Sequence, residues 1–278
     1  MTPSNIFALA AADDAQSCYA ATDAGLWTWS TTSGHWKQIA KQFAPVTLTA
    51  VVVSARTVLI GANGDIAVSR DDARTFGLAT LPVKAQVLAL AISPNFAVDR
   101  IVLAATAQDG VLRSTDGGAS FHAWNFGLID LHVNALLMSP DFANDATVFA
   151  ATDHAVFQST NSGRAWRELA LPAEAAPYTA LAFGAKGKLL VGTEGSGLWS
   201  SAAPYAVFAR ESRMPAAEIN ALVSSPRGAH AATSDGIFAY TGRTWKRVHA
   251  AGDALALTAA GDAVFAGTAD GAMVAVGE

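Results

Sequence analysis

Residues 87–106 read VLALAISPNFAVDRIVLAAT, and residues 133–152 read VNALLMSPDFANDATVFAAT. The two stretches are copies of one unit, and their closing threonines lie 46 residues apart. Weaker copies occupy residues 6–22, 48–62, 178–193, 222–233 and 255–268. Copies at a fixed spacing are the mark of a repeat architecture, in which each unit buries its apolar side against its neighbours.

The closing residues of the copies set the repeat period. They are Thr22, Ala62, Thr106, Thr152, Thr193, Thr233 and Thr268, and the successive gaps are 40, 44, 46, 41, 40 and 35 residues. A period near 40 residues suits the four-stranded blades of β-propellers as well as some helical repeats. Short Val-, Ile-, Leu-, Ala- and Thr-rich runs between Gly, Asp, Asn, Ser and Pro favour strands. No stretch sustains a helical apolar face over three turns, so we predict an all-β, seven-bladed β-propeller.

Each repeat divides into four predicted antiparallel strands. The first, such as 88–92, is wholly apolar, as expected for an innermost strand that neighbours cover on both faces. The seventh repeat stops at Glu278, after its third strand. We therefore predict a three-stranded last blade with an edge open to pairing. The expected organisation is one domain, residues 1–278, with approximate blades at 5–41, 46–81, 84–128, 132–172, 178–214, 218–250 and 253–278.

Composition excludes several classes of protein. With 51% hydrophobic and 15% charged residues, the chain has ample material for a core and is not intrinsically disordered. A net charge of −5 argues against a broad nucleic-acid footprint, and the single cysteine, Cys18, excludes a disulfide framework. Lys37 is the first basic residue, so we predict no secretory signal, and no apolar run is long enough to span a bilayer. We expect a soluble, cytoplasmic protein.

The loops between third and fourth strands carry a recurring motif. Residues 114–121 read STDGGASF and residues 159–166 read STNSGRAW, while 69–76 read SRDDARTF with Ala73 in place of the Gly. This pattern resembles the Asp-box, Ser-x-Asp-x-Gly-x-Thr-Trp/Phe, of the BNR-repeat superfamily, which includes sialidases, sortilin-type receptors, xyloglucanases and the photosystem II assembly propeller. The resemblance implies structural loops on the face opposite any binding centre. The matching residues are Ser114, Asp116, Gly118, Phe121, Ser159, Asn161, Gly163 and Trp166.

An acidic residue follows the second strand of every repeat. The seven are Asp23, Asp65, Asp109, Asp153, Glu194, Asp235 and Asp270. If the blades are radial, these carboxylates ring one face, where they would attract cations or basic partners. Turn chemistry alone also places Asp before Gly, and both readings can hold together. The connections between blades add His132, Tyr178 and Arg213 as candidates for a ligand or partner face.

The chain lacks the parts of a sialidase site. No arginine precedes Arg56, and no Arg-Ile-Pro motif occurs. The six histidines show no metal-ligand spacing, so we expect neither a metal nor a cofactor. The sequence favours a non-catalytic binding or assembly scaffold that presents one propeller face to another protein or to a small ligand or glycan at the central channel. The alternative is a carbohydrate-active protein, a glycoside hydrolase or a lectin, with a site at the channel mouth. We expect a monomer or an edge-paired homodimer.

Overall fold

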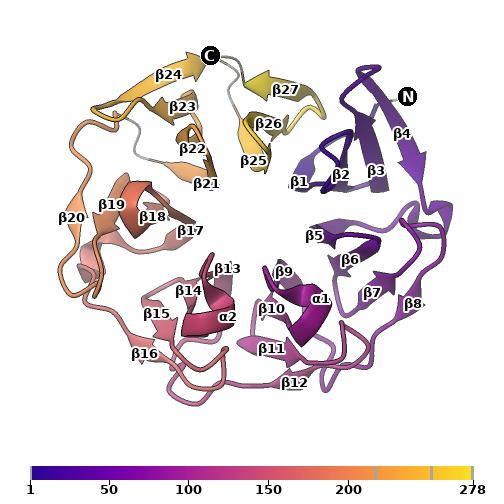
Figure 1. The fold of residues 1–278 in the computed structure, drawn as a ribbon, viewed down its shortest axis with the longest axis horizontal. Helices are drawn as coiled ribbons and strands as arrows, with labels where there is room; N and C mark the ends of the chain where they lie inside the picture. Colours follow the sequence, from indigo (N-terminus) through magenta and orange to yellow (C-terminus); the bar gives the residue numbers. More distant parts are fainter. Residues whose placement is uncertain (1, 216–217, 251–252, 277–278) are drawn as a thin grey trace.

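Seven antiparallel sheets surround a central axis like the blades of a propeller (Figure 1). The computed structural model describes residues 2–215, 218–250 and 253–276. Six sheets have four strands and the last has three, as the repeats predicted. In each blade the strands follow chain order from the axis outward, so every blade is a simple meander.

The strands have the following bounds. Blade 1 holds β1 (Ile6–Ala11), β2 (Ser17–Thr22), β3 (Gly25–Ser30) and β4 (His35–Ile39), and blade 2 holds β5 (Leu48–Ser54), β6 (Thr57–Ala62), β7 (Ile66–Ser69) and β8 (Gly77–Leu78). Blade 3 holds β9 (Val87–Ile92), β10 (Val102–Thr106), β11 (Val111–Ser114) and β12 (His122–Ala123), and blade 4 holds β13 (Val133–Met138), β14 (Val148–Thr152), β15 (Val156–Ser159) and β16 (Arg167–Glu168). Blade 5 holds β17 (Tyr178–Phe183), β18 (Leu189–Thr193), β19 (Leu198–Ser201) and β20 (Ala209–Arg210), and blade 6 holds β21 (Ile219–Ser225), β22 (Gly228–Thr233), β23 (Gly236–Tyr240) and β24 (Trp245–His249). Blade 7 holds β25 (Ala254–Ala260), β26 (Ala263–Thr268) and β27 (Met273–Val276).

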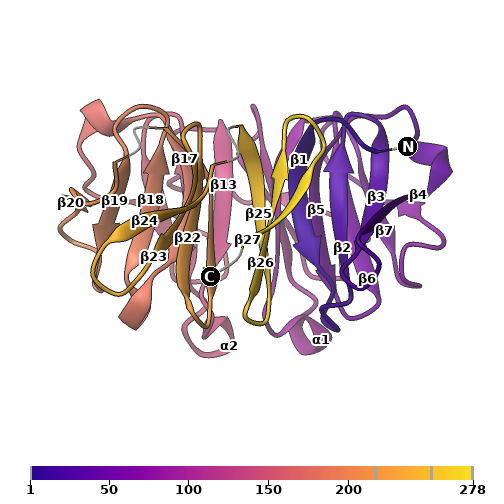
Figure 2. The same ribbon diagram turned by 90° about the horizontal axis from the view of Figure 1, so that it is seen from above.

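Short helices lie in the connections. They are α1 (Phe96–Asp99), α2 (Phe142–Asp145) and the 3-10 turns η1 (Lys41–Phe43), η2 (Ala173–Ala175) and η3 (Ala185–Gly187). Figure 2 shows α1 and α2 at the same end of the ring. Because strand direction alternates, the loops from first to second and from third to fourth strands share that end, which we call the helix face. The turns from second to third strands and the starts of the inner strands lie at the other end, the turn face.

Neighbouring blades pack through a small residue, which faces a larger one at six of the seven joints. The penultimate residue of each second strand is Ala or Gly, and the first residue of the next inner strand packs against it. A Cβ on Gly61 would come within 2.6 Å of Val87, and one on Gly192 within 2.7 Å of Ile219. The third residue of the inner strand is alanine in all seven blades: Ala8, Ala50, Ala89, Ala135, Ala180, Ala221 and Ala256. Small side chains at these two positions let seven sheets meet around one axis.

A change at Gly192 tests this packing. Gly192→Ala places a methyl group 2.7 Å from Ile219 Cγ2 and 3.2 Å from Ala180 Cβ, so overpacking should lower the free energy of unfolding by about 1–3 kcal/mol. The readout is the urea midpoint at constant m-value. Gly77→Ala is the control, because a Cβ there meets nothing within 4 Å.

A double-mutant cycle assigns the cause of that loss. Blades 6 and 7 already meet through an alanine pair, Ala232 and Ala254. Gly192→Ala combined with Ile219→Ala should therefore be less destabilised than the sum of the two single changes. Additive effects would contradict a direct contact between residue 192 and Ile219.

Candidate functional site

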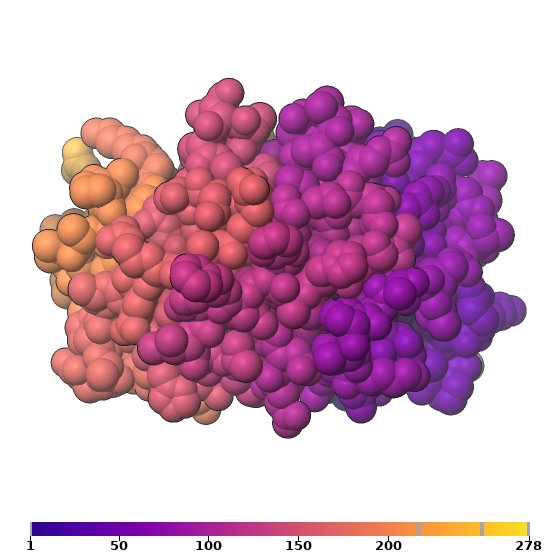
Figure 3. Space-filling view, turned by 90° about the horizontal axis from the view of Figure 1, so that it is seen from below, coloured from indigo at the N-terminus to yellow at the C-terminus, as the bar shows by residue number. Residues whose placement is uncertain are grey.

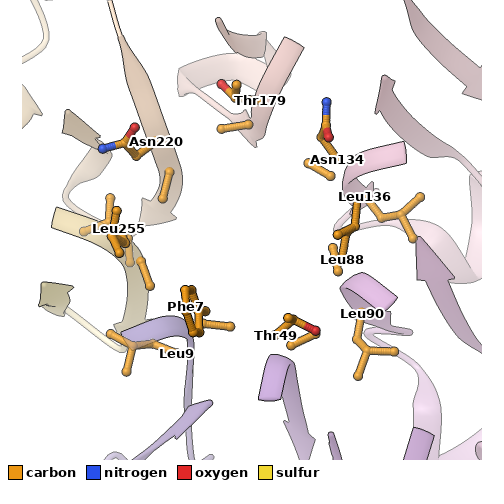
Figure 4. Close-up of a pocket in the computed structure, with 18 of the residues that line it drawn as sticks. Phe7, Leu9, Thr49, Leu88, Leu90, Asn134, Leu136, Thr179, Asn220 and Leu255 are labelled. Carbon is orange, nitrogen blue, oxygen red and sulfur yellow. The ribbon is translucent and has the colours of Figure 1, made fainter. Parts of the chain in front are cut away.

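The inner strands of all seven blades line a central channel. Its cavity measures about 300 Å³. Each inner strand carries a β-bulge at its second residue, where the register with the second strand shifts. The residues at these bulges surround the channel in Figure 4, and they are Phe7, Thr49, Leu88, Asn134, Thr179, Asn220 and Leu255. Sequence reasoning missed this ring, although the position is readable as the second residue of each inner strand.

The polar members of the ring join neighbouring blades. Asn134 Nδ2 donates to the Tyr178 carbonyl at 3.0 Å, and Asn220 Nδ2 donates to the Ala254 carbonyl at 3.0 Å. Thr179 Oγ1 donates to the Ile219 carbonyl at 2.6 Å, and Thr49 Oγ1 donates to the Val87 carbonyl. Each acceptor is the first residue of the next inner strand. These side chains act as latches between blades, and the other three ring positions are apolar.

All seven acids predicted from the repeats lie in turns between second and third strands, and therefore at the turn face. They are exposed or half-buried. Asp23 accepts hydrogen bonds from Ser4 Oγ at 2.8 Å and Asn5 Nδ2 at 2.9 Å, and Asp153 accepts one from Asn134 Nδ2 at 3.0 Å. The structure thus brings the seven acids to one end of the ring, spread over seven blades, and engages several of them in local hydrogen bonds.

Buried threonines shape these turns. The Thr106 hydroxyl donates to the Gly110 carbonyl at 2.8 Å and accepts the Asp109 amide at 3.0 Å. The same pair of bonds recurs in five further blades, at Thr22, Thr152, Thr193, Thr233 and Thr268. Such buried side-chain hydrogen bonds hold a tight turn, which supports the turn-chemistry reading of the neighbouring acids.

Three further candidates have different surroundings. His132 lies at the turn face, with Nδ1 3.8 Å from Asp153 Oδ2. Tyr178 is fully buried, and its hydroxyl donates to the Pro172 carbonyl at 2.7 Å, so it is a packing residue and does not reach the face as predicted. Burial raises the pKa of Tyr178 to about 12. Arg213 donates to the Arg243 carbonyl at 2.5 Å, in the loop between β23 and β24, and so binds a loop of the helix face.

The loops with the Ser-x-Asp pattern each contain the same arrangement of hydrogen bonds. The Gly118 amide donates to Ser114 Oγ at 2.9 Å, and Ser114 Oγ donates to Asp116 Oδ1 at 2.7 Å. Asp116 also accepts the Ser120 amide at 3.0 Å and the Ser120 hydroxyl at 2.6 Å. Ser159 and Asn161 repeat the arrangement in blade 4, and Ser69 and Asp71 repeat it in blade 2. Phe121 and Trp166, which close the motif, are buried.

The glycine of the motif has a steric cause. Gly118 and Gly163 have φ values of 86° and 78°, which non-glycine residues rarely adopt. A Cβ on Gly118 would also lie 2.4 Å from Leu59 Cδ2 of the preceding blade. These loops therefore lie tight against the neighbouring sheet, on the helix face.

The connection between blades 3 and 4 is anchored along its length. Asn125 Oδ1 accepts the Val111 amide at 2.8 Å, and its Nδ2 donates to the Asp109 carbonyl at 2.8 Å. Gly127 passes so close to Trp166 that a Cβ would lie 2.2 Å from the Trp166 carbonyl oxygen. Leu128 is buried in the core between the two blades. The segment is therefore held at three points within four residues.

The residues beside and between these anchors expose large apolar side chains. Phe126 is 82% exposed and Ile129 is 80% exposed, while Trp124 and Leu131 are each 39% exposed. We call these four residues the apolar strip. Among the large apolar side chains exposed in the described part of the chain, no other connection carries as many. Figure 3 views the molecule from the side of blades 3 and 4, where this connection crosses the outer wall. Sequence reasoning did not identify Trp124, Ile129 or Leu131.

A hollow of about 410 Å³ adjoins the strip. It is lined by Ile129, Asp130, His154, Ala155, Phe157 and Glu168. Asp130 Oδ2 lies 3.0 Å from His154 Nδ1 and accepts the His154 amide at 2.9 Å. Burial alone would raise the pKa of Asp130, but hydrogen bonds from Thr152, His154 and His132 outweigh it and lower that pKa. The hollow therefore places apolar side chains beside a carboxylate whose lowered pKa keeps it ionised.

Two kinds of feature are absent from the described ranges. Within residues 2–215, 218–250 and 253–276, no three His, Cys, Asp or Glu side chains gather in a way that could hold a metal ion. Across the same residues, no helix is both long and apolar enough to cross a bilayer. Cys18 is buried, and burial raises the pKa of its thiol to about 11.

Comparisons with known proteins identify the fold. No protein-family model and no curated protein sequence matches the chain. The GH74 xyloglucanase from Xanthomonas campestris superposes with a TM-score of 0.81 at 16% identity, over 99% of this chain and 52% of that one, so the chain spans about half the length of the enzyme. Streptogramin B lyase superposes with a TM-score of 0.78 at 12% identity, over 97% of this chain and 92% of that one. YCF48 bound to D1 peptide superposes with a TM-score of 0.76 at 12% identity, over 100% and 93%.

The lowered pKa of Asp116 predicts that the stability contributed by its loop depends on pH. Burial alone would raise this pKa, but hydrogen bonds from Ser120 and Ser114 lower it to about 2, against about 3.9 in an unfolded chain. A lowered pKa in the folded state means that the ionised form stabilises the fold above pH 4, and that this contribution is lost as pH falls to about 2. Asp116→Asn should therefore be less stable than the wild type above pH 4 and match it near pH 2.

The reverse change serves as the control. Asn161→Asp converts the blade 4 loop to the blade 3 pattern, so it should gain stability above pH 4 and lose the gain near pH 2. Urea midpoints between pH 2 and 7 measure both variants. Differences that stay constant with pH would refute the assignment.

Proposed function

We propose that this propeller is a binding scaffold whose apolar strip, with the hollow beside it, receives an extended segment of a partner protein. The observation that carries the proposal is the exposure of Trp124, Phe126, Ile129 and Leu131 on one anchored connection. A monomer gains nothing by exposing such a group of side chains, and contiguous apolar surface marks interaction sites. Aromatic residues are also the side chains most enriched at binding hot spots.

Anchoring is the second support for the proposal. Asn125, Gly127 and Leu128 hold the backbone of the connection, so the strip keeps its shape before a partner arrives. A surface that is already ordered loses less conformational entropy on binding. The strip therefore suits recognition of a flexible segment, because most of the ordering falls on the partner.

Charge around the strip indicates the composition of that segment. Asp130 and Glu168 line the hollow. Asp153 lies 3.8 Å from His132, which follows Asp130 by two residues. The protein as a whole carries a net charge of −5. An apolar segment flanked by Lys or Arg would therefore meet complementary charge at the rim.

The similar solved structures are compatible with both binding and hydrolysis. One solved relative, YCF48, is described as bound to D1 peptide, and another is a xyloglucanase. A glycosidase needs one carboxyl with a raised pKa as its general acid. In this chain Asp71, Asp116, Asp130, Glu211 and Asp270 have lowered pKa values. These five carboxyls therefore do not fit that role. The exposed apolar strip leads us to prefer peptide binding. We also propose that the three Ser-x-Asp loops are Asp-box staples of the BNR type that serve folding.

A displayed library of 12-residue peptides, selected on the wild-type protein, tests the strip. We expect enriched peptides to combine apolar residues with Lys or Arg. Their affinity, measured by fluorescence anisotropy, should fall at least tenfold for Phe126→Ser with Ile129→Ser, because two large contacts are lost.

The matched control is Val98→Ser with Val207→Ser, which changes two exposed apolar residues away from the strip and should leave the affinity unchanged. Equal binding by both double variants would reject the strip as the site. Turnover of xyloglucan oligosaccharides that the strip variant retains would favour the hydrolase reading instead.

A further inference from the structure

The third strand of blade 7 is more exposed than its six counterparts. Strand register pairs Gly267 with Met273, and the same pairing defines the counterpart in each other blade. These counterparts are Leu26, Ile66, Val111, Val156, Leu198 and Ile237, and every one is 0% exposed. Met273 is half-buried, and so are Val274 and Val276. What differs is the fourth strand, which covers the third strand in six blades and not in blade 7 within the described residues.

An aromatic residue in each fourth strand, or directly before it, packs into the core between its own blade and the preceding one. The residues are Trp36, Phe76, Phe121, Trp166, Phe208 and Trp245, and each belongs to a different inter-blade cluster. The seventh cluster, between blades 6 and 7, contains only Ala, Val, Leu and Ile side chains among the described residues. That core lacks the side chain that fills the other six.

In four of the six blades a second side chain, three positions after the aromatic residue, packs into the cluster with the following blade. These residues are Ile39, Ala79, Leu169 and Val248. In blades 3 and 5 the position is occupied by Trp124 and Glu211. The two positions lie on opposite faces of the fourth strand, because side chains alternate along a strand. In these four blades an aromatic-x-x-aliphatic segment therefore covers both sides of the fourth strand.

Backbone hydrogen bonds fix where such a segment must pair. The amide three residues after the aromatic donates to the carbonyl of the Met273 counterpart in four blades: Ala79 to Ile66 at 2.8 Å, Trp124 to Val111 at 3.0 Å, Leu169 to Val156 at 2.8 Å and Glu211 to Leu198 at 2.8 Å. By this register the Met273 carbonyl faces outward. Backbone groups alternate along a strand, so the Ala275 amide faces the same way.

We propose that blade 7 binds, in trans, an extended segment of a partner protein that runs antiparallel to β27 and carries an aromatic-x-x-aliphatic motif. The aromatic side chain would enter the core between blades 6 and 7, and the aliphatic one would cover Met273 on the side of blade 1. A second copy of the chain does not fit through its own β27, because residues 272–276 read AMVAV and hold no aromatic residue. This is strand addition to a sheet edge, with side-chain contacts on both faces that confer specificity.

A peptide copied from the chain itself provides the probe. Residues 163–171, GRAWRELAL, form the fourth-strand region of blade 4 and contain the motif. We expect the fluorescein-labelled peptide to bind the intact protein saturably in an anisotropy titration. Replacing its tryptophan by alanine should weaken binding at least tenfold, because the side chain that fills the core is lost.

Two variants at one position separate strand pairing from general stickiness. Ala275→Pro removes the outward amide, which serves no bond to β26 in this register, and should weaken peptide binding at least tenfold. Ala275→Ser keeps the amide and should bind as the wild type does. Urea midpoints verify that both variants fold, and should Ala275→Pro fail to fold, slowed hydrogen exchange of the Ala275 amide in the wild-type complex replaces it.

Several outcomes would overturn the proposal. These are an absence of saturable binding, equal affinity for the tryptophan and alanine peptides, and equal binding by the Pro and Ser variants. Sedimentation that shows a wild-type dimer broken by Ala275→Pro would assign the edge to a second copy instead. None of these outcomes bears on the apolar strip of blades 3 and 4, so the two proposals stand or fall separately.

Discussion

The fold depends on how closely neighbouring sheets can approach at the axis. Seven twisted sheets converge there, and the residue that faces each neighbour must be small. Gly61, Gly192 and Gly267 are the extreme cases, since a single added carbon would overlap the next blade. Because interiors are as dense as organic crystals, the larger partner at the start of the next inner strand fills the space that remains. The conserved chemistry of the repeat, with a small residue before the closing threonine, follows from this geometry.

That constraint separates the structural and the variable parts of the molecule. Near the axis each blade repeats the alanine of the inner strand, a small residue (Ala or Gly) in the second strand and, in six blades, the threonine turn. Symmetry is lost with distance from the axis, where the outer connections differ in length and composition. The apolar strip and the uncovered edge of β27 both lie in this outer region. Features that distinguish one blade from another are therefore the best candidates for function.

Repeats predicted the fold, the three-stranded last blade and the turns that hold the acids, because these depend on local pattern. Two kinds of feature escaped. Tyr178 was predicted to lie on a binding face, yet it occupies the first position of an inner strand, where Val87 and Ile219 are equally buried; aligning it with the other repeats would have placed it correctly. The outward direction of Ile129 beside the buried Leu128 was not readable, since it depends on contacts of Asn125 and Gly127 with residues distant in sequence.

The joint between blades 1 and 7 differs from the other six in one respect: the two blades are not consecutive in the chain. Ile6 packs against Gly267 at this joint. Two hydrogen bonds also cross it: the Ala11 amide donates to Thr258 Oγ1 at 3.0 Å, and the Asn5 amide donates to the Ala269 carbonyl at 3.0 Å. Six joints form between sequence neighbours, whereas this one must bring the two ends of the described chain together. The entropic cost of closing the ring is therefore concentrated at this one joint. Non-local contacts of this kind form late in folding, so blades can assemble in order along the chain before the circle shuts.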